Sequence, residues 1–372
     1  MIELETVADF DSHVDQHDSL DSIAVQALDL CDRSEVLLTI SVDGAVFMGC
    51  VVEPEVQRRL IREATVFPRF PDLPFRAFRA DLYDADELFG GYTPGDKDSF
   101  EAAFDTKVYR WFDRSRQGHN VVDLLAQRVH DHSIDDALEH VLDDGTRDRV
   151  VAIMGGHGMR RDEESYVAVA RLARQLTRSG FVCASGGGPG AMEATNFGAW
   201  MATHADGALD EALAVLAAAP TFEPVPDWLD AAFDVRLRWP LPHGTLSSLG
   251  IPTWHYGHEP PNVFASHIAK YFANSIREDG LLAIALAGVV FAPGSAGTIQ
   301  EVFQDAAQNH YKSFGIASPM VFMGRDYWTH DKPVYPLLAQ LADGHDYGEL
   351  LAIEDDVDAI AARLSEHARL RG

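Results

Sequence analysis

The sequence predicts an α/β protein whose larger part is a doubly wound, Rossmann-like and mostly parallel sheet. From residue 150 onward, short apolar segments of strand length alternate with amphipathic segments of helical length. This alternation is typical of parallel sheets covered by helices on both faces. Three of the expected strands run directly into glycine-rich loops. The first 145 residues lack the alternation, and we expect them to form an N-terminal α+β accessory domain.

Two domains are therefore expected, at residues 1–145 and 146–372. The chain is longer than one average domain, and a hydrophobic fraction of 47% is ordinary for a globular protein. In the first domain, residues 36–52 alternate around Asp43-Gly44, a pair that favours a two-residue β-hairpin. A helix is expected at residues 132–143.

The second domain is expected to begin with a strand at residues 150–154 and an amphipathic helix that ends before Gly180. A second strand at 181–184 leads into a helix of small residues, and residues 205–247 form an insertion. The remaining expected elements are a third strand at 249–256, a helix at 262–278, a fourth strand at 288–291, a fifth strand at 319–323 and a last helix at 357–367.

The composition argues against several classes of partner. A formal charge of −28 would repel DNA, RNA and anionic membranes, although an acid-rich proteome would explain the charge equally well. Cys31, Cys50 and Cys183 are too widely spaced for a zinc site or a disulfide framework. The sequence shows no signal segment and no apolar run long enough to span a bilayer. We therefore expect a cytoplasmic protein without metal or cofactor.

The glycine-rich junctions predict an anion-binding site. Backbone N–H groups and the positive end of a helix meet at such junctions and attract phosphate. Glycines also serve simply to make tight turns, so the prediction rests on three junctions occurring in one sheet. The residues expected to bind ligand are Gly156 in the first loop, Gly187, Gly188 and Met192 at the second, and Gly294, Ser295, Ala296, Gly297 and Thr298 in the third.

Two other cofactor classes fit the sequence poorly. Residues 186–191 satisfy G-x-G-x-x-A, but no acidic residue ends the next expected strand, as a dinucleotide site requires. Pyridoxal chemistry lacks a convincing lysine, because Lys270 is expected on a helix face and Lys312 and Lys332 near loops.

Residues 293–301, Pro-Gly-Ser-Ala-Gly-Thr-Ile-Gln-Glu, resemble the P-G-G-x-G-T-x-x-E signature of the LOG-type, lysine-decarboxylase-like phosphoribohydrolases. Residues 186–194 are similar to that family's other glycine motif. The resemblance covers residues 150–364 apart from the insertion. It implies hydrolysis of the N-glycosidic bond of a nucleoside 5′-monophosphate, giving a free base and ribose 5-phosphate, by a homodimer or larger homo-oligomer.

The resemblance also implies two catalytic residues. Glu301 would stabilise a positively charged sugar and orient water, and Arg277 matches the family's arginine if one extra residue of spacing is allowed. Each has a simpler interpretation, because Thr298-x-x-Glu301 is also a capping box and Arg277 could complement a helix dipole. His267 and Lys270 remain substitutes for Arg277.

Other features stay open at this point. His157 is more typical of a turn or surface residue than of a catalytic base, and His255, Tyr256 and His258 are a possible wall for the base. Ser295 replaces a family glycine, which would cost about 1 kcal/mol or more if that position needs a positive φ. The alternative function is a non-catalytic nucleotide or cofactor carrier on the same fold.

Overall fold

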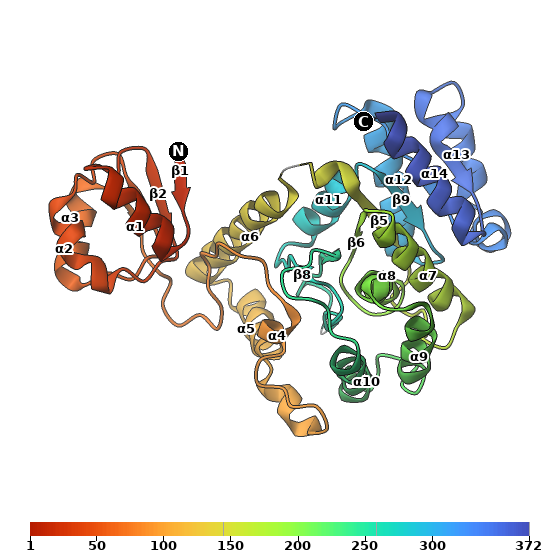
Figure 1. Ribbon diagram of the computed structural model, residues 1–372, viewed down its shortest axis with the longest axis horizontal. Helices are drawn as coiled ribbons and strands as arrows, with labels where there is room; N and C mark the ends of the chain where they lie inside the picture. The colour runs from red at the N-terminus through yellow and green to blue at the C-terminus, as the bar shows by residue number, and fades with distance from the viewer. Residues whose placement is uncertain (144, 258, 372) are drawn as a thin grey trace. The chain divides into compact units, whose positions relative to one another are not determined.

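The computed structural model describes residues 1–143, 145–257 and 259–371. These residues form two compact units, one of Met1–Leu82 with Arg110–His140 and one of Tyr83–Tyr109 with Val141–Gly372. The segment Tyr83–Tyr109 thus belongs to the second unit. Both units contain a parallel sheet with helices between the strands, which confirms the expected α/β class (Figure 1). The α+β arrangement expected for the first unit is wrong, because its helices alternate with parallel strands. Within the described residues, no helix is long and apolar enough to cross a membrane.

The first unit contains a four-stranded sheet in which every strand pairs in parallel with the next strand along the chain. Its elements are β1 (Ile2–Leu4), α1 (Val7–Gln16), β2 (Ile23–Gln26), the short η1 (Cys31–Arg33), α2 (Ser34–Thr39), β3 (Val46–Met48), α3 (Pro54–Glu63) and β4 (Thr65–Phe67). The expected hairpin around Asp43-Gly44 is wrong, because residues before this turn form helix α2 rather than a strand.

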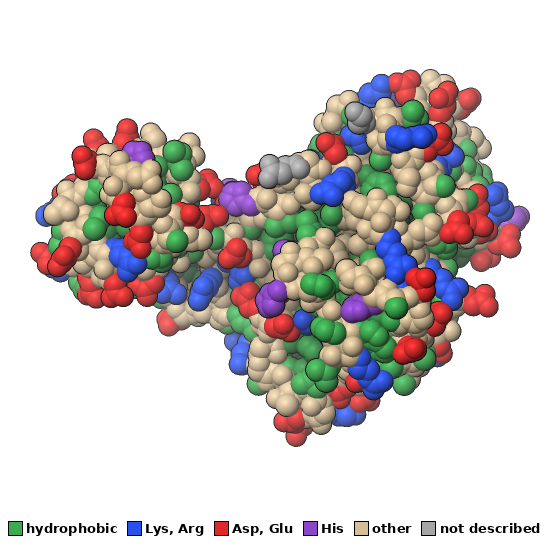
Figure 2. All heavy atoms as spheres, viewed as in Figure 1, with side chains coloured by type: hydrophobic (Ala, Val, Ile, Leu, Met, Phe, Trp, Pro, Cys, Tyr) green, Lys and Arg blue, Asp and Glu red, His purple; other side chains and the backbone are tan. Residues whose placement is uncertain are grey.

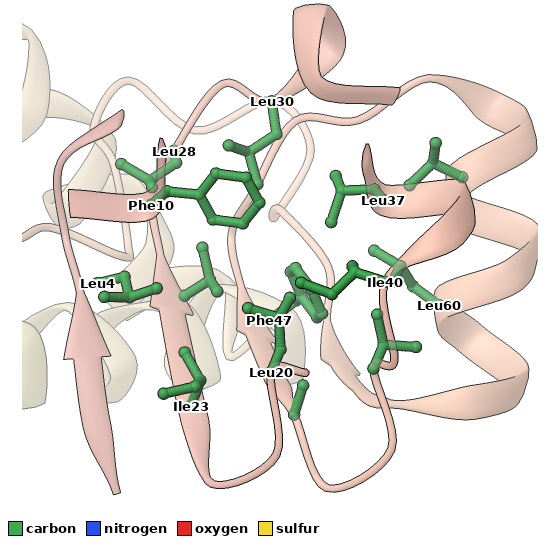
Figure 3. Close-up of a cluster of buried hydrophobic side chains, with 14 residues drawn as sticks. Leu4, Phe10, Leu20, Ile23, Leu28, Leu30, Leu37, Ile40, Phe47 and Leu60 are labelled. Atoms are coloured by element: carbon green, nitrogen blue, oxygen red, sulfur yellow. The ribbon is translucent and has the colours of Figure 1, made fainter. Parts of the chain in front are cut away.

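Successive turns of this unit stack in register like the coils of a solenoid. Ala24 pairs with Val46, and isolated parallel bridges join Ser19 to Ser41 and Asp29 to Val51, three pairs with the same separation along the chain. Leu4, Phe10, Leu20, Phe47 and Leu60 are among the buried side chains that fill the space between sheet and helices (Figure 3). The apolar residues whose alternation suggested a hairpin therefore belong to two different elements. Those before the turn are in helix α2, and those after it are in strand β3.

The expected helix at residues 132–143 is the last part of a longer helix, α6 (Val121–Leu142). It follows α5 (Phe104–Gly118).

The second unit contains a seven-stranded parallel sheet in the order β11-β10-β9-β5-β6-β7-β8. The strands are β5 (Val150–Met154), β6 (Val182–Ser185), β7 (Ser248–Gly250), β8 (His267–Ile268), β9 (Gly288–Phe291), β10 (Met320–Phe322) and β11 (Leu351–Ile353). The chain winds outward from β5 toward β8 and then restarts at β9 on the other side of β5. The strand order thus changes direction between β5 and β9, where doubly wound proteins bind their ligands.

The second unit also contains helices before, between and after its strands. They are α4 (Ala85–Leu88), α7 (Glu164–Arg178), α8 (Ala191–Trp200), α9 (Asp206–Leu216), α10 (Val225–Arg238), α11 (Asn274–Ile284), α12 (Ala296–Tyr311), α13 (Val334–Ala342) and α14 (Val357–Arg371). The insertion consists largely of α9 and α10, and a buried polar cluster holds it to α8. In this cluster Arg161 pairs with Glu193 at 2.5 Å and donates to the Trp228 carbonyl at 3.1 Å.

The expected helix at residues 262–278 is wrong in its first half. Asn262 accepts hydrogen bonds from the backbone N–H groups of Phe264 and Ala265, at 3.1 and 3.2 Å, which offers the backbone an alternative to helix. The chain then forms strand β8, and the helix begins only at Asn274. Ile268, Tyr271 and Phe272 have helical spacing, but they are buried in an extended segment.

Candidate ligand-binding site

The three glycine-rich loops meet at the carboxyl ends of β5, β6 and β9. The N–H of Gly156 donates to the Pro293 carbonyl at 3.0 Å, and the N–H of Ala191 donates to the Gly156 carbonyl at 3.1 Å. A Cβ on Gly156 would lie 3.4 Å from the Gly294 Cα. Gly190 has a φ of +69° and lies against the carbonyls of the first loop. A residue with a side chain would therefore clash at this position. The first loop is therefore held between the other two.

The third loop ends at the N-terminus of α12. Ser295 is the N-cap residue, its side chain makes no capping hydrogen bond, and residues 295–297 are exposed. Thr298 is buried, and a Cβ on Gly294 would overlap its hydroxyl. The helix thus presents the positive end of its dipole, without a side-chain cap, at the point where the strand order changes direction.

Two sequence expectations about this loop change. Ser295 has a φ of −106°, so the cost of a positive φ at this position does not arise. Because the helix begins at Ala296, Thr298 is its third residue rather than its cap, and Thr298 with Glu301 does not form a capping box. Capping therefore does not explain Glu301.

The structure brings Glu301 and Arg277 together. Nη1 of Arg277 lies 3.7 Å from Oε1 of Glu301, and the side chains are 10% and 12% exposed. Burial raises the pKa of Glu301 to about 7, since it outweighs the lowering effect of Arg277 and is reinforced by Glu278. A substantial fraction of Glu301 is then protonated near neutral pH and able to donate a hydrogen bond.

Arg277 is held by contacts that the sequence did not reveal. Its Nε donates to the Ile251 carbonyl, just beyond β7, at 2.8 Å. A Cβ on Gly186 would overlap Nη2 of the same guanidinium. Gly186 therefore has to be glycine because it leaves room for Arg277.

The second loop is mostly buried, and its glycines serve close packing. Gly187 has a φ of +71°, and a Cβ there would lie 2.7 Å from Pro252. The Gly188 carbonyl accepts a hydrogen bond from Asn262 at 3.1 Å. The Met192 side chain is only partly buried and lies against Gly186 and Gly188, so among these residues it is the best placed to contact a ligand.

The alternatives to Arg277 lie in other environments. Lys270 is fully buried, pairs with Asp105 at 2.5 Å and lies 4.9 Å from the centre of the Trp254 ring. Lys270 lies outside any helix, so the prediction that it lies on a helix face is wrong. His267 is in β8, where burial lowers its pKa.

The remaining polar candidates lie at the surface. His157 is exposed and lies 3.9 Å from Glu259. His255 and Tyr256 are exposed, and the Tyr256 hydroxyl donates to Glu278 at 3.3 Å. His258 lies outside the described residues.

Comparisons with known proteins give matches among solved structures. No protein-family model matches the chain, and no curated protein matches it. A molybdenum cofactor binding protein from Rippkaea orientalis is 14% identical, with a TM-score of 0.36, over 58% of this chain and 95% of that one. The molybdenum cofactor carrier protein of Chlamydomonas reinhardtii is 16% identical, with a TM-score of 0.37, over 59% of this chain and 98% of that one.

These findings correct the expected family and activity. The matched structures are described as cofactor carrier or binding proteins and not as nucleotide hydrolases, and no family model supports LOG-type membership. The expected membership of the LOG-type phosphoribohydrolases, and with it the expected N-glycosidase activity, is therefore wrong. The short motif at residues 293–301 misled because the same glycine loop and helix N-terminus serve any phosphorylated ligand.

Proposed function

We propose that this protein is a non-catalytic binding or carrier protein for a phosphorylated small molecule, either a nucleotide or a cofactor. The observation that carries the proposal is the N-terminus of α12, which has no side-chain cap and lies beside the switch between β5 and β9. The N–H groups of Ala296, Gly297 and Thr298 would bind the phosphate there.

Arg277 and Glu301 would contact the part of the ligand next to the phosphate. Arg277 is anchored by the Ile251 carbonyl and lies beside a largely buried carboxyl group. Glu301, with a pKa of about 7, can either donate or accept a hydrogen bond in the neutral range. The pair would therefore recognise a hydroxyl or amide group of the ligand without catalysing its cleavage.

The phosphate site is tested by placing a negative charge in it. Gly297 is the second residue of α12, and a Cβ there meets no atom within 4 Å, so Gly297→Asp fits without a clash. An aspartate in the first turn favours a helix but repels phosphate. Gly207 is the second residue of α9 and has the same open surroundings, so Gly207→Asp is a matched control.

The measurement is equilibrium binding of a panel of nucleoside 5′-monophosphates and of molybdenum cofactor, the ligand named for the matched structures. We expect at least one member to bind, Gly297→Asp to weaken it at least about tenfold, and Gly207→Asp to leave it within about twofold. Equal affinities for both variants would contradict a phosphate site at α12.

We also propose a homodimer in a reducing, cytoplasmic setting. Leu337 and Leu341 lie one turn apart on α13 and are 49% and 51% exposed, which suits a contact between copies. Light scattering at micromolar concentration should give twice the chain mass, and Leu337→Lys with Leu341→Lys should give the monomer. A native monomer at that concentration would contradict the proposal.

A further inference from the structure

The first unit has a cavity of its own at the carboxyl edge of its small parallel sheet. The cavity measures about 480 Å³, within the range of small-molecule sites. Its lining includes the residues that follow three successive strands, Ala27 and Asp29 after β2, Gly49 and Val51 after β3, and Arg69 and Phe70 after β4. Parallel sheets commonly bind ligands at this edge.

The backbone at this edge has a repeated, unusual conformation. Ala27 and Gly49 stand at equivalent positions of two successive turns, with φ of +58° and +64°. A left-handed φ is uncommon for alanine, because its Cβ approaches the following carbonyl oxygen. A Cβ on Gly49 would lie 2.5 Å from the Phe78 ring, so the segment from Arg69 to Phe78 passes close over the strand ends.

The charges in the cavity are balanced. Arg69 and Arg76 are exposed and form no ion pair among the residues that the structure describes. Asp29 and Asp72 line the same space and carry the opposite sign. A purely anionic ligand would face two carboxylates, and a purely cationic one would face two guanidinium groups. A ligand with one charge of each sign would satisfy both pairs.

The rest of the lining is apolar and aromatic. The rings of Phe70 and Phe78 are stacked with their centres 6.1 Å apart, and Leu73 and Phe75 also line the cavity. Such a surface gains free energy by covering an apolar group. We propose that this cavity binds a free α-amino acid with an apolar side chain, its carboxylate toward Arg69 and Arg76 and its ammonium group toward Asp29 and Asp72.

The test is isothermal titration of the full-length protein with L-phenylalanine. Phenylacetate lacks the ammonium group and 2-phenylethylamine lacks the carboxylate, so each isolates one half of the recognition. We expect L-phenylalanine to bind with a Kd of about 1 mM or tighter, and both analogues to bind at least about tenfold more weakly. Either analogue binding as well as the amino acid would overturn the proposal.

Variants locate the site. Arg76→Gln and Asp72→Asn should each weaken L-phenylalanine at least about fivefold, with circular dichroism and melting temperature unchanged because both side chains are exposed. Arg58→Gln and Asp32→Asn, at exposed positions outside the cavity, are the matched controls and should keep the native affinity. The absence of binding at about 10 mM for L-phenylalanine, L-leucine and L-valine, or equal effects of cavity and control variants, would overturn it.

Discussion

Glu301 is a largely buried carboxyl group on α12. Its motif marked it, and the structure places it beside Arg277. Burial is the main cause that raises the pKa of Glu301 to about 7, so the raised pKa is not by itself evidence of catalysis. Perturbed carboxyl groups occur in binding sites as well as in catalytic ones.

The raised pKa of Glu301 makes the stability of the native protein depend on pH. Folding favours the protonated form, so stability is full below about pH 4.5 as far as this group is concerned and falls as pH rises through about 7. Glu301→Gln resembles the protonated form and should remove this loss. At pH 8 we expect the variant to be more stable than the native protein by up to about 3 kcal/mol.

Urea unfolding at pH 5 and pH 8 measures this difference. Glu164→Gln, at the exposed start of α7, serves as the control and should follow the native pH dependence. If Glu301→Gln lost stability with rising pH as steeply as the native protein does, Glu301 would not carry the raised pKa.

The contacts of Arg277 with Gly186 and Ile251 could not be predicted from the sequence. Arg277 was predicted from its approximate spacing, but its partners come from the second glycine-rich loop and from the residue just beyond β7. Only the strand order brings these positions together. A side chain at Gly186 would overlap the Arg277 guanidinium, and nothing in the sequence near Gly186 indicates this contact.

At the scale of elements, local patterns predicted well and non-local ones did not. The helices α7 and α14 and the strands β5 and β9 match the expectations closely, because each has an apolar pattern bounded by glycine or polar residues. Strand β8 was missed, because an Asn262 side chain and burial override an apparent helical stripe.

The solenoid-like turns of the first unit were missed for a different reason. Their repeat is in backbone conformation more than in residue type, since Ser22 and Ala27 in one turn correspond to Gly44 and Gly49 in the next, all with positive φ. Alanine and serine rarely adopt a positive φ, so neither residue indicates this conformation in a sequence. The Asp43-Gly44 pair was therefore interpreted as a hairpin turn.

One element outside the predicted loops holds the third glycine-rich loop, which forms the proposed phosphate site. The hydroxyl of Tyr327, in the π-helical turn η5 (Tyr327–Asp331), donates a hydrogen bond to the Gly294 carbonyl. Trp328 in the same turn donates to the Phe291 and Met323 carbonyls, each at 3.0 Å. This turn thus anchors the end of β9 and the start of the third loop.

Tyr327→Phe should therefore loosen the loop without unfolding the protein. Loss of one hydrogen bond costs roughly 1 kcal/mol, so we expect phosphorylated-ligand affinity to fall about fivefold. The hydroxyl of Tyr335 has no hydrogen-bond partner within the described part of the chain, and Tyr335→Phe is the control. Equal affinities of the two variants, measured by equilibrium binding, would show that η5 does not position the loop.

Considered as a whole, the protein has one proposed site in each unit, at the carboxyl edge of a parallel sheet. Acidic side chains are scattered over both units on the face shown in Figure 2, in keeping with the charge of −28. Against that background, an anion can be bound only where local backbone dipoles and arginines oppose the overall field. The N-terminus of α12, beside Arg277, provides such a place in the second unit.

Binding of a phosphorylated ligand without turnover can be measured in a single incubation. A tightly bound phosphorylated member of the panel is incubated with stoichiometric protein for hours and then recovered, with its dephosphorylated form titrated in parallel. We predict full recovery of the intact ligand and an affinity at least about a hundredfold lower without the phosphate. Release of a free base, or equal affinity for both forms, would contradict the account.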